Sequence, residues 1–213
     1  MSSEYVDPDA LAKLLDAVEG ERELLSFFGK HPHALYWALC RMGGHCRYVF
    51  REFPLGSSYI ADFVLLNSYS GTWEVKFVEF EPASAKVFTK AGVPAQRLAG
   101  AVKQVDDWCE YFERHREQVR ADLVRWARTK DLLGYDDGDT PSNFSGNLLS
   151  DPSTYLLLSA YVFVGRRERL SAQEHTQKAR FSSRHNVEVA TYDRILDLVR
   201  ERYKNRAYWL GEA

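Results

Sequence analysis

The stretch that decides the fold is residues 59–82, YIADFVLLNSYSGTWEVKFVEFEP. It contains two mainly apolar runs, rich in the β-branched and aromatic residues that strands favour. The turn-forming residues NSYSGT (67–72) separate these runs, and Pro82 ends the second one. A third run, CRYVFREF (46–53), comes just before them and is set apart by the turn signal PLGS. Three such runs at close spacing predict an antiparallel β-meander.

Helical patterns precede and follow this meander in the sequence. The longest is predicted from Ala95 to about Arg128, because apolar residues recur along one stripe at helical spacing. The run TYLLLSAYVFVGRR (154–167) is nearly all apolar, as expected of a strand covered on both faces. The remaining segments predict helices at 7–20, 21–44, 171–183 and 193–203 and a short strand at 187–192. Within 21–44, Pro32 marks a break or a fresh helix start. We therefore expect an α/β fold with a mixed sheet of about five strands, formed by residues 1–213 as a single domain.

Composition excludes several functional classes. The chain has 213 residues, a formal net charge of −2 and a pI near 6.3, which gives no electrostatic signature of a protein that coats DNA. Its cysteines are odd in number and form no C-x-x-C pair, so disulfide staples and structural zinc are not expected at Cys40, Cys46 or Cys109. No segment approaches 18 uninterrupted apolar residues, and the N-terminus lacks the apolar core of a signal peptide. We expect a cytoplasmic protein without a membrane partner.

Three acidic residues stand out in the meander. On a strand, Glu79 and Glu81 share one face with Phe77, and Asp62 interrupts the apolar run of the preceding strand. If these two strands pair as a hairpin, Asp62 lies across from Glu79 or Glu81. One interpretation is an ordinary solvated polar face. The other is a divalent cation site, because converging carboxylates repel one another unless a cation lies between them. Ligands that are all oxygen favour Mg²⁺ or Mn²⁺ over zinc.

Other motifs leave alternatives open or exclude functions. Gln104 is expected on or beside the sheet-facing stripe of the long helix, where its amide either caps a strand end or orients water or metal. The basic cluster GRRERL (165–170) either holds a phosphate backbone or is a solvated helix start. The sequence contains no P-loop, no G-x-G-x-x-G and no G-x-S-x-G. We therefore expect neither a nucleotide cofactor nor serine catalysis.

An Asp in one strand, a Glu-x-Glu that ends the next and a long helix carrying a Gln together resemble the PD-(D/E)XK nuclease superfamily. The run ADFVLL…WEVKFVEFEPASAKVFTKAGVPAQRLAGAVKQVDDW (61–108) is similar, more narrowly, to the nuclease domain of Shedu anti-phage defence proteins. The segments ERELLSFFGKHPHAL and YVFVGRR…VEVATYDRILDLV resemble the opening and closing parts of that domain, so that the similarity covers roughly residues 19–200.

This resemblance implies a restriction-endonuclease-like fold and a Mg²⁺- or Mn²⁺-dependent DNA endonuclease of anti-phage defence. It also implies DNA as the partner and assembly into a homo-oligomer. Carried over residue by residue, it assigns Asp62 and Glu79 to the metal-binding acids, Glu21 to an additional metal acid on the first helix, and Gln104 to the polar helix residue.

The sequence departs from the superfamily pattern at one position. The pattern has a lysine two residues after the second acid, and Glu81 occupies that place here. We expect Glu81 to join the metal ligands and Lys90, on the loop before the helix, to assist catalysis, with Lys86 and Lys103 as alternatives. A second hypothesis is a catalytically inactive nuclease fold that serves as a DNA-binding or assembly module.

Overall fold

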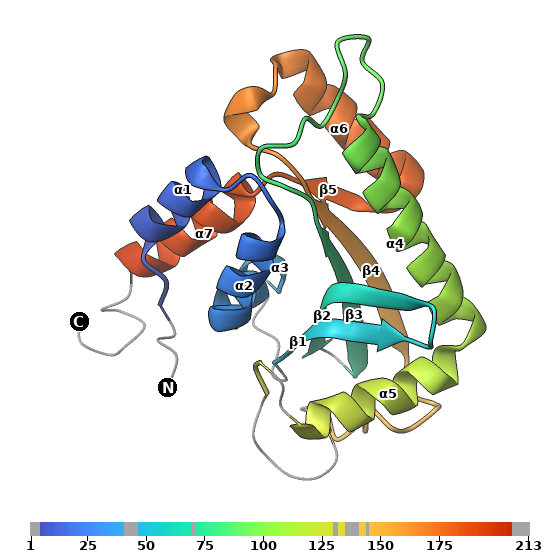
Figure 1. Ribbon diagram of the computed structural model, residues 1–213. Coiled ribbons are helices and arrows are strands. Elements are labelled where there is room, and N and C mark those ends of the chain that lie inside the picture. Colours follow the sequence, from blue (N-terminus) through green and yellow to red (C-terminus); the bar gives the residue numbers. More distant parts are fainter. Residues whose placement is uncertain are drawn as a thin grey trace.

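The computed structural model describes residues 5–40, 47–69, 71–129, 132–134, 141–143 and 145–205. Its centre is one five-stranded sheet with the order β1-β2-β3-β4-β5 (Figure 1). The strands are β1 (Tyr48–Leu55), β2 (Tyr59–Tyr69), β3 (Thr72–Phe80), β4 (Leu156–Phe163) and β5 (Glu188–Ala190). The first three are antiparallel neighbours, whereas β4 lies parallel to β3 and β5 parallel to β4. The predicted meander and mixed sheet are confirmed.

The turn between β2 and β3 sets the register of the site. Gly71 has a φ of 82°, a conformation that glycine adopts without steric cost. From this turn the antiparallel ladder runs from Tyr69 opposite Thr72 to Phe63 opposite Val78. The next pair in the same register is Asp62 opposite Glu79, at the end of the ladder that lies farthest from the turn.

Helices cover both faces of the sheet (Figure 1). One apolar core forms between the sheet and α1 (Pro8–Ala17), α2 (Arg22–Lys30), α3 (Pro32–Leu39) and α7 (Asp193–Lys204). The other forms against α4 (Gln96–Arg114), α5 (Arg116–Thr129) and α6 (Ala172–His185), and a short 3₁₀ turn (Arg167–Arg169) precedes α6. Alternation along β3 follows from these two cores: Phe77 lies in the second, and Val78 and Phe80 lie in the first.

The prediction of one helix from Ala95 to about Arg128 is wrong. The helix ends at Arg114, and α5 begins at Arg116 after His115, whose φ of −127° is not helical. The second helix packs on β1, where Trp126 makes edge-on contacts with Phe50 and Phe53. After the break, the buried side of α5 belongs to the same apolar core as Phe50 and Phe53 of β1.

Two of the three cysteines lie in the described residues, and both Cys40 and Cys109 are free thiols. Cys46 lies outside the described residues. Within the described ranges, no helix is long and apolar enough to cross a membrane.

Candidate active site

Asp62 and Glu79 meet at the end of the β2–β3 ladder. The backbone N–H of Phe80 donates a hydrogen bond of 2.8 Å to Asp62 Oδ2, which fixes the orientation of that carboxylate. The carboxyl groups of Asp62 and Glu79 also share a hydrogen bond. The structure thus brings together the two acids that the register predicts to face each other.

These two acids hold a proton between them. Burial and the charge of Asp62 raise the pKa of Glu79 from the ordinary 4.5 to about 10. Burial also raises the pKa of Asp62, to about 6, although its hydrogen bonds with Phe80 and Glu79 oppose this. At neutral pH Glu79 is therefore the protonated partner that donates to the Asp62 carboxylate. Glu79 Oε2 is buried and has no hydrogen-bond partner among the described residues.

Glu81 follows two residues later and meets an arginine that the sequence analysis did not single out. Arg97 Nη1 lies 3.4 Å from Glu81 Oε2 and 4.0 Å from Glu21 Oε2. Burial raises the pKa of Glu81 to about 7, and the Arg97 guanidinium opposes that shift. Glu21 directly precedes α2 and adds negative charge that raises the pKa of each of the three strand acids. Arg97 thus lies between Glu21 and Glu81.

An aromatic cluster fixes the main chain at this end of β3. The hydroxyl of Tyr192, which precedes α7, donates a hydrogen bond of 2.7 Å to the carbonyl oxygen of Glu81. The Tyr192 ring packs against Phe80, which in turn contacts Phe28 and Phe163 edge-on. Burial and the surrounding acids raise the pKa of Tyr192 well above 10, so its hydroxyl keeps the proton that it donates.

The acids lie where the parallel strands end. Glu79 is opposite Val162 of β4, and the N–H of Glu81 donates to the Phe163 carbonyl at 2.8 Å. Beyond the strand ends, the N–H of Gly165 donates to the carbonyl of Pro82 at 3.3 Å. The carboxyl ends of neighbouring parallel strands are the usual place for ligand sites in open α/β sheets.

Comparison with known families gives one family match. Residues 19–196 match the family model described as "Shedu protein SduA, C-terminal". The chain belongs to this Shedu family. The matched range contains all of the acids described above, and family membership supports a role in Shedu defence. No curated protein matches the chain.

Four side chains that the sequence analysis considered for the site lie away from the acid pair. Gln104 is on the exposed side of α4, not on the stripe that faces the sheet. Lys90 and Lys86 are exposed and line a cavity formed by the loop between β3 and α4. Lys103 is exposed on α4, where it pairs with Asp107 at 3.1 Å. The positive charge beside the acids comes instead from Arg97.

Lys76, a buried lysine on β3 of the Shedu domain, has a partner of opposite charge, whereas Glu79 forms no ion pair among the described residues. Lys76 is 3% exposed, yet it is paired with Glu74 and lies over the Tyr161 ring, 5.5 Å from its centroid. Glu79 is 7% exposed, and the charged side chains that act on its pKa most strongly are other carboxylates. A buried carboxyl without a cation is unfavourable unless it keeps its proton.

A divalent cation requires oxygen ligands that converge on one point. Within the described part of the chain, no group of three or more His, Cys, Asp or Glu side chains is arranged to hold a metal ion. The expected set of Asp62, Glu79, Glu81 and Glu21 is therefore not assembled as one cage, because Arg97 is placed beside Glu81 and Glu21. Mg²⁺ does not need such a cage: one or two carboxylates, with water and substrate phosphate, are its usual ligands. Asp62, Glu79 and the unpartnered Oε2 fit that smaller donor set.

Proposed function

We propose that the chain is a metal-dependent nuclease that hydrolyses phosphodiester bonds of DNA in Shedu anti-phage defence. The observation that carries this proposal is the pair of half-buried Asp62 and buried Glu79, with its unpartnered Glu79 Oε2, at the carboxyl end of β3. Such a pair has no evident structural benefit, because burial of two carboxyls without a cation costs stability. With both carboxyls ionised, the pair is favourable only when a cation is bound.

The topology supports a place in the PD-(D/E)XK superfamily. Asp62 lies on the second strand of an antiparallel meander, Glu79 on the third, and α4 then leads over to the parallel strand β4. This is the order of acids and elements on which the resemblance to that superfamily rests. The match of residues 19–196 to the Shedu family points the same way.

Asp62 and Glu79 would hold a Mg²⁺ or Mn²⁺ ion. Such an ion, when bound, lowers the pKa of a water ligand and neutralises charge on the reacting phosphate. The protein supplies the rest. The Phe80 N–H keeps the Asp62 carboxylate aimed at Glu79, and the Tyr192 hydroxyl holds the main chain at Glu81, so the two strand ends are positioned before substrate arrives.

Arg97 takes the role that the motif lysine has in the superfamily pattern. Its side chain is 61% exposed, so the guanidinium can contact a phosphate while one of its nitrogens stays near Glu81. A guanidinium offers two parallel N–H groups to phosphate oxygens and stays charged at every accessible pH. It would therefore stabilise the negative charge that develops on the phosphate during hydrolysis.

Replacing Arg97 tests this assignment. Arg97→Ala should lower the rate of DNA cleavage on the order of 10²-fold, with Arg97→Lys retaining more activity. Because the side chain is exposed, the melting temperature should hardly change. Arg114→Ala is the matched control, since Arg114 is 70% exposed on the same helix and lies away from the acids. Equal rates for Arg97→Ala and Arg114→Ala would exclude a role for Arg97 in catalysis.

The function itself is tested with purified protein on supercoiled plasmid and linear DNA at pH 7–9. Nicked or cut products that appear with Mg²⁺ or Mn²⁺ and disappear with EDTA are the expected result. Intact DNA with both metals would contradict the nuclease proposal. It would favour the alternative function, a DNA-binding or assembly module, for which Glu81 in the place of the lysine is the supporting observation.

A further inference from the structure

A cavity of about 510 Å³ lies between two segments that are far apart in sequence. One wall is the loop of residues 82–95 that joins β3 to α4, and the other is the segment from Arg166 to Glu174. In Figure 1 the green loop extends alongside the orange start of α6. Apolar side chains of Val87, Phe88 and Leu170 contribute to the lining.

The charged side chains around this cavity are mostly cationic and mostly unpaired. Among the described residues, Lys86, Lys90 and Arg169 have no carboxylate within ion-pair distance. Arg169 uses Nη1 to donate to the Ser84 carbonyl at 3.1 Å. The one acid in the lining, Glu174, accepts hydrogen bonds of 2.8 Å from the N–H and hydroxyl of Ser171 in a capping box.

A fourth cation in the lining is already neutralised. Arg166 pairs with Asp16 and Asp193, is 6% exposed, and anchors the second wall. The net positive charge that an incoming ligand meets therefore comes from Lys86, Lys90 and Arg169. Two of these lie on the loop and one on the facing segment, so an anion between the walls would meet cations from both sides.

The loop wall is held in place before any ligand binds. Gln177 of α6 donates to the carbonyl of Gly92, and Phe88 forms a β-bridge with Pro94 across the loop. Gly165, with a φ of 67°, lets the facing segment approach closely, since a Cβ there would lie 2.8 Å from the Ala85 carbonyl oxygen. The cavity is therefore a built feature of the fold.

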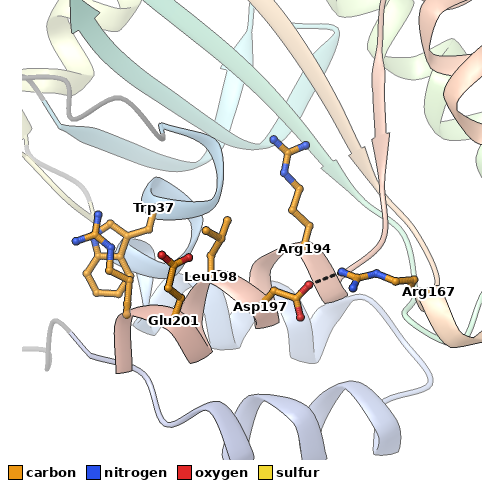
Figure 2. A pocket seen from close by; sticks show the side chains of 7 residues that line it. Trp37, Arg167, Arg194, Asp197, Leu198 and Glu201 are labelled. Atoms are coloured by element: carbon orange, nitrogen blue, oxygen red, sulfur yellow. Dashed lines mark hydrogen bonds and ion pairs between the residues drawn. The ribbon is translucent and has the colours of Figure 1, made fainter. Parts of the chain in front are cut away.

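A cavity over α7 is similar in size and differs in charge. It has a volume of about 540 Å³, and its cations are engaged. Figure 2 shows Arg167 paired with Asp197. Arg194 pairs with Glu188, and Arg202 lies over the Trp37 ring, 5.3 Å from its centroid. Within the described part of the chain, that cavity offers an anion no comparable unpaired charge.

The cavity lined by Lys86, Lys90 and Arg169 is close to the acids along the chain. Ser84, in its wall, is three residues beyond Glu81, and Ala95, also in its wall, is two residues before Arg97. Three residues of extended chain span at most about 11 Å. One DNA strand advances about 3.4 Å per nucleotide, so the cavity lies within about three nucleotides of a phosphate at the acids.

We propose that the cavity between the 82–95 loop and residues 166–174 is a binding subsite for the sugar-phosphate backbone of the DNA strand that is cut at the acids. This assignment rests on the proposed function, and it gives Lys86, Lys90 and Arg169 the role of phosphate contacts. The apolar lining would take the sugar or base edge of the same nucleotide. Base identity is not recognised by such contacts, so the subsite positions the strand without selecting its sequence.

The test is DNA binding measured by fluorescence anisotropy, with labelled duplex and single-stranded DNA, at several salt concentrations and with Ca²⁺ in place of Mg²⁺. Lys86→Ala/Lys90→Ala should weaken binding about tenfold or more and reduce the slope of log K against log salt by about 1–2. The matched control is Lys13→Ala/Lys30→Ala, which removes two other exposed lysines, one on α1 and one at the end of α2. Equal affinity and slope for the two double variants would overturn the subsite.

The outcome separates this inference from the nuclease proposal. If wild-type protein binds DNA through these lysines but no metal supports cleavage, the subsite holds and the nuclease function fails. If the wild type cleaves DNA and Lys86→Ala/Lys90→Ala leaves KM and kcat unchanged, the nuclease function holds and the subsite fails. Absence of DNA binding by the wild type would overturn the subsite directly.

Discussion

Asp62→Asn and Glu79→Gln are each expected to reduce metal-dependent DNA cleavage by more than about 100-fold. Loss of a residue that only orients a metal ligand already costs about 10- to 100-fold, so loss of a ligand itself should cost more. Both substitutions keep the shape of the side chain and remove its charge. In Asp62→Asn the Phe80 N–H can still donate to the amide oxygen of the new side chain, so the loss is not attributable to a displaced strand end.

Cleavage rates are measured at saturating Mg²⁺ and again at saturating Mn²⁺, with melting temperatures to confirm folding. Glu110→Gln serves as the control, because Glu110 is 58% exposed on α4 and, among the described residues, forms an ion pair only with Arg114. If both site variants retain more than a tenth of the wild-type rate while Glu110→Gln is fully active, the acids are not the metal ligands and the proposed mechanism is wrong.

Local periodicity was enough to predict the sheet and to place Asp62 across from Glu79 or Glu81, and the structure selects Glu79. Alternation along residues 72–80 and the turn at Gly71 fix the register of β2 and β3, and the register alone places Asp62 opposite Glu79. Local sequence also predicted β4, because a nearly continuous apolar run is typical of a strand that is covered on both faces.

The remaining parts of the site depend on long-range packing. Arg97 reaches Glu81 only because the 82–95 loop returns α4 to the end of β3, and Tyr192 reaches the Glu81 carbonyl from 111 residues away. No local pattern encodes either contact. Gln104 shows the same limit, since it is one residue from Val105 in sequence but about 100° around the helix, and it faces solvent.

Lys76 and Glu79 are both buried on β3, but within the described part of the chain the fold provides a partner of opposite charge only for Lys76. The fold gives the buried lysine a carboxylate and an aromatic face, and it gives the buried glutamate another carboxyl. Polar groups inside a protein are normally satisfied by the protein, and those that are not commonly mark a functional position. Under the proposed function, the acid pair is therefore a place where lower stability of the metal-free protein accompanies a capacity to bind a cation.

The acid pair should also make the stability of the metal-free protein depend on pH. Without metal, the wild type should become less stable as pH rises from about 6 to 9, and Glu79→Gln should remove most of this loss. The folded protein keeps the Glu79 proton up to a pKa of about 10, whereas the unfolded chain releases it near 4.5. Between these values the folded state binds more protons than the unfolded state, so the free energy of unfolding falls with pH, by at most about 1.4 kcal/mol per unit.

The measurement is thermal or denaturant unfolding of wild type, Glu79→Gln and Glu110→Gln in EDTA at pH 6, 7, 8 and 9. From pH 6 to pH 8 the wild type should lose up to about 3 kcal/mol relative to Glu79→Gln, several degrees in melting temperature for a chain of this size. Mg²⁺ binds the ionised pair, so it should restore the wild type at pH 8 and leave Glu79→Gln unchanged. Parallel pH profiles for wild type and Glu79→Gln, with no response to Mg²⁺, would show that Glu79 is not held protonated and that no cation takes the place of its proton.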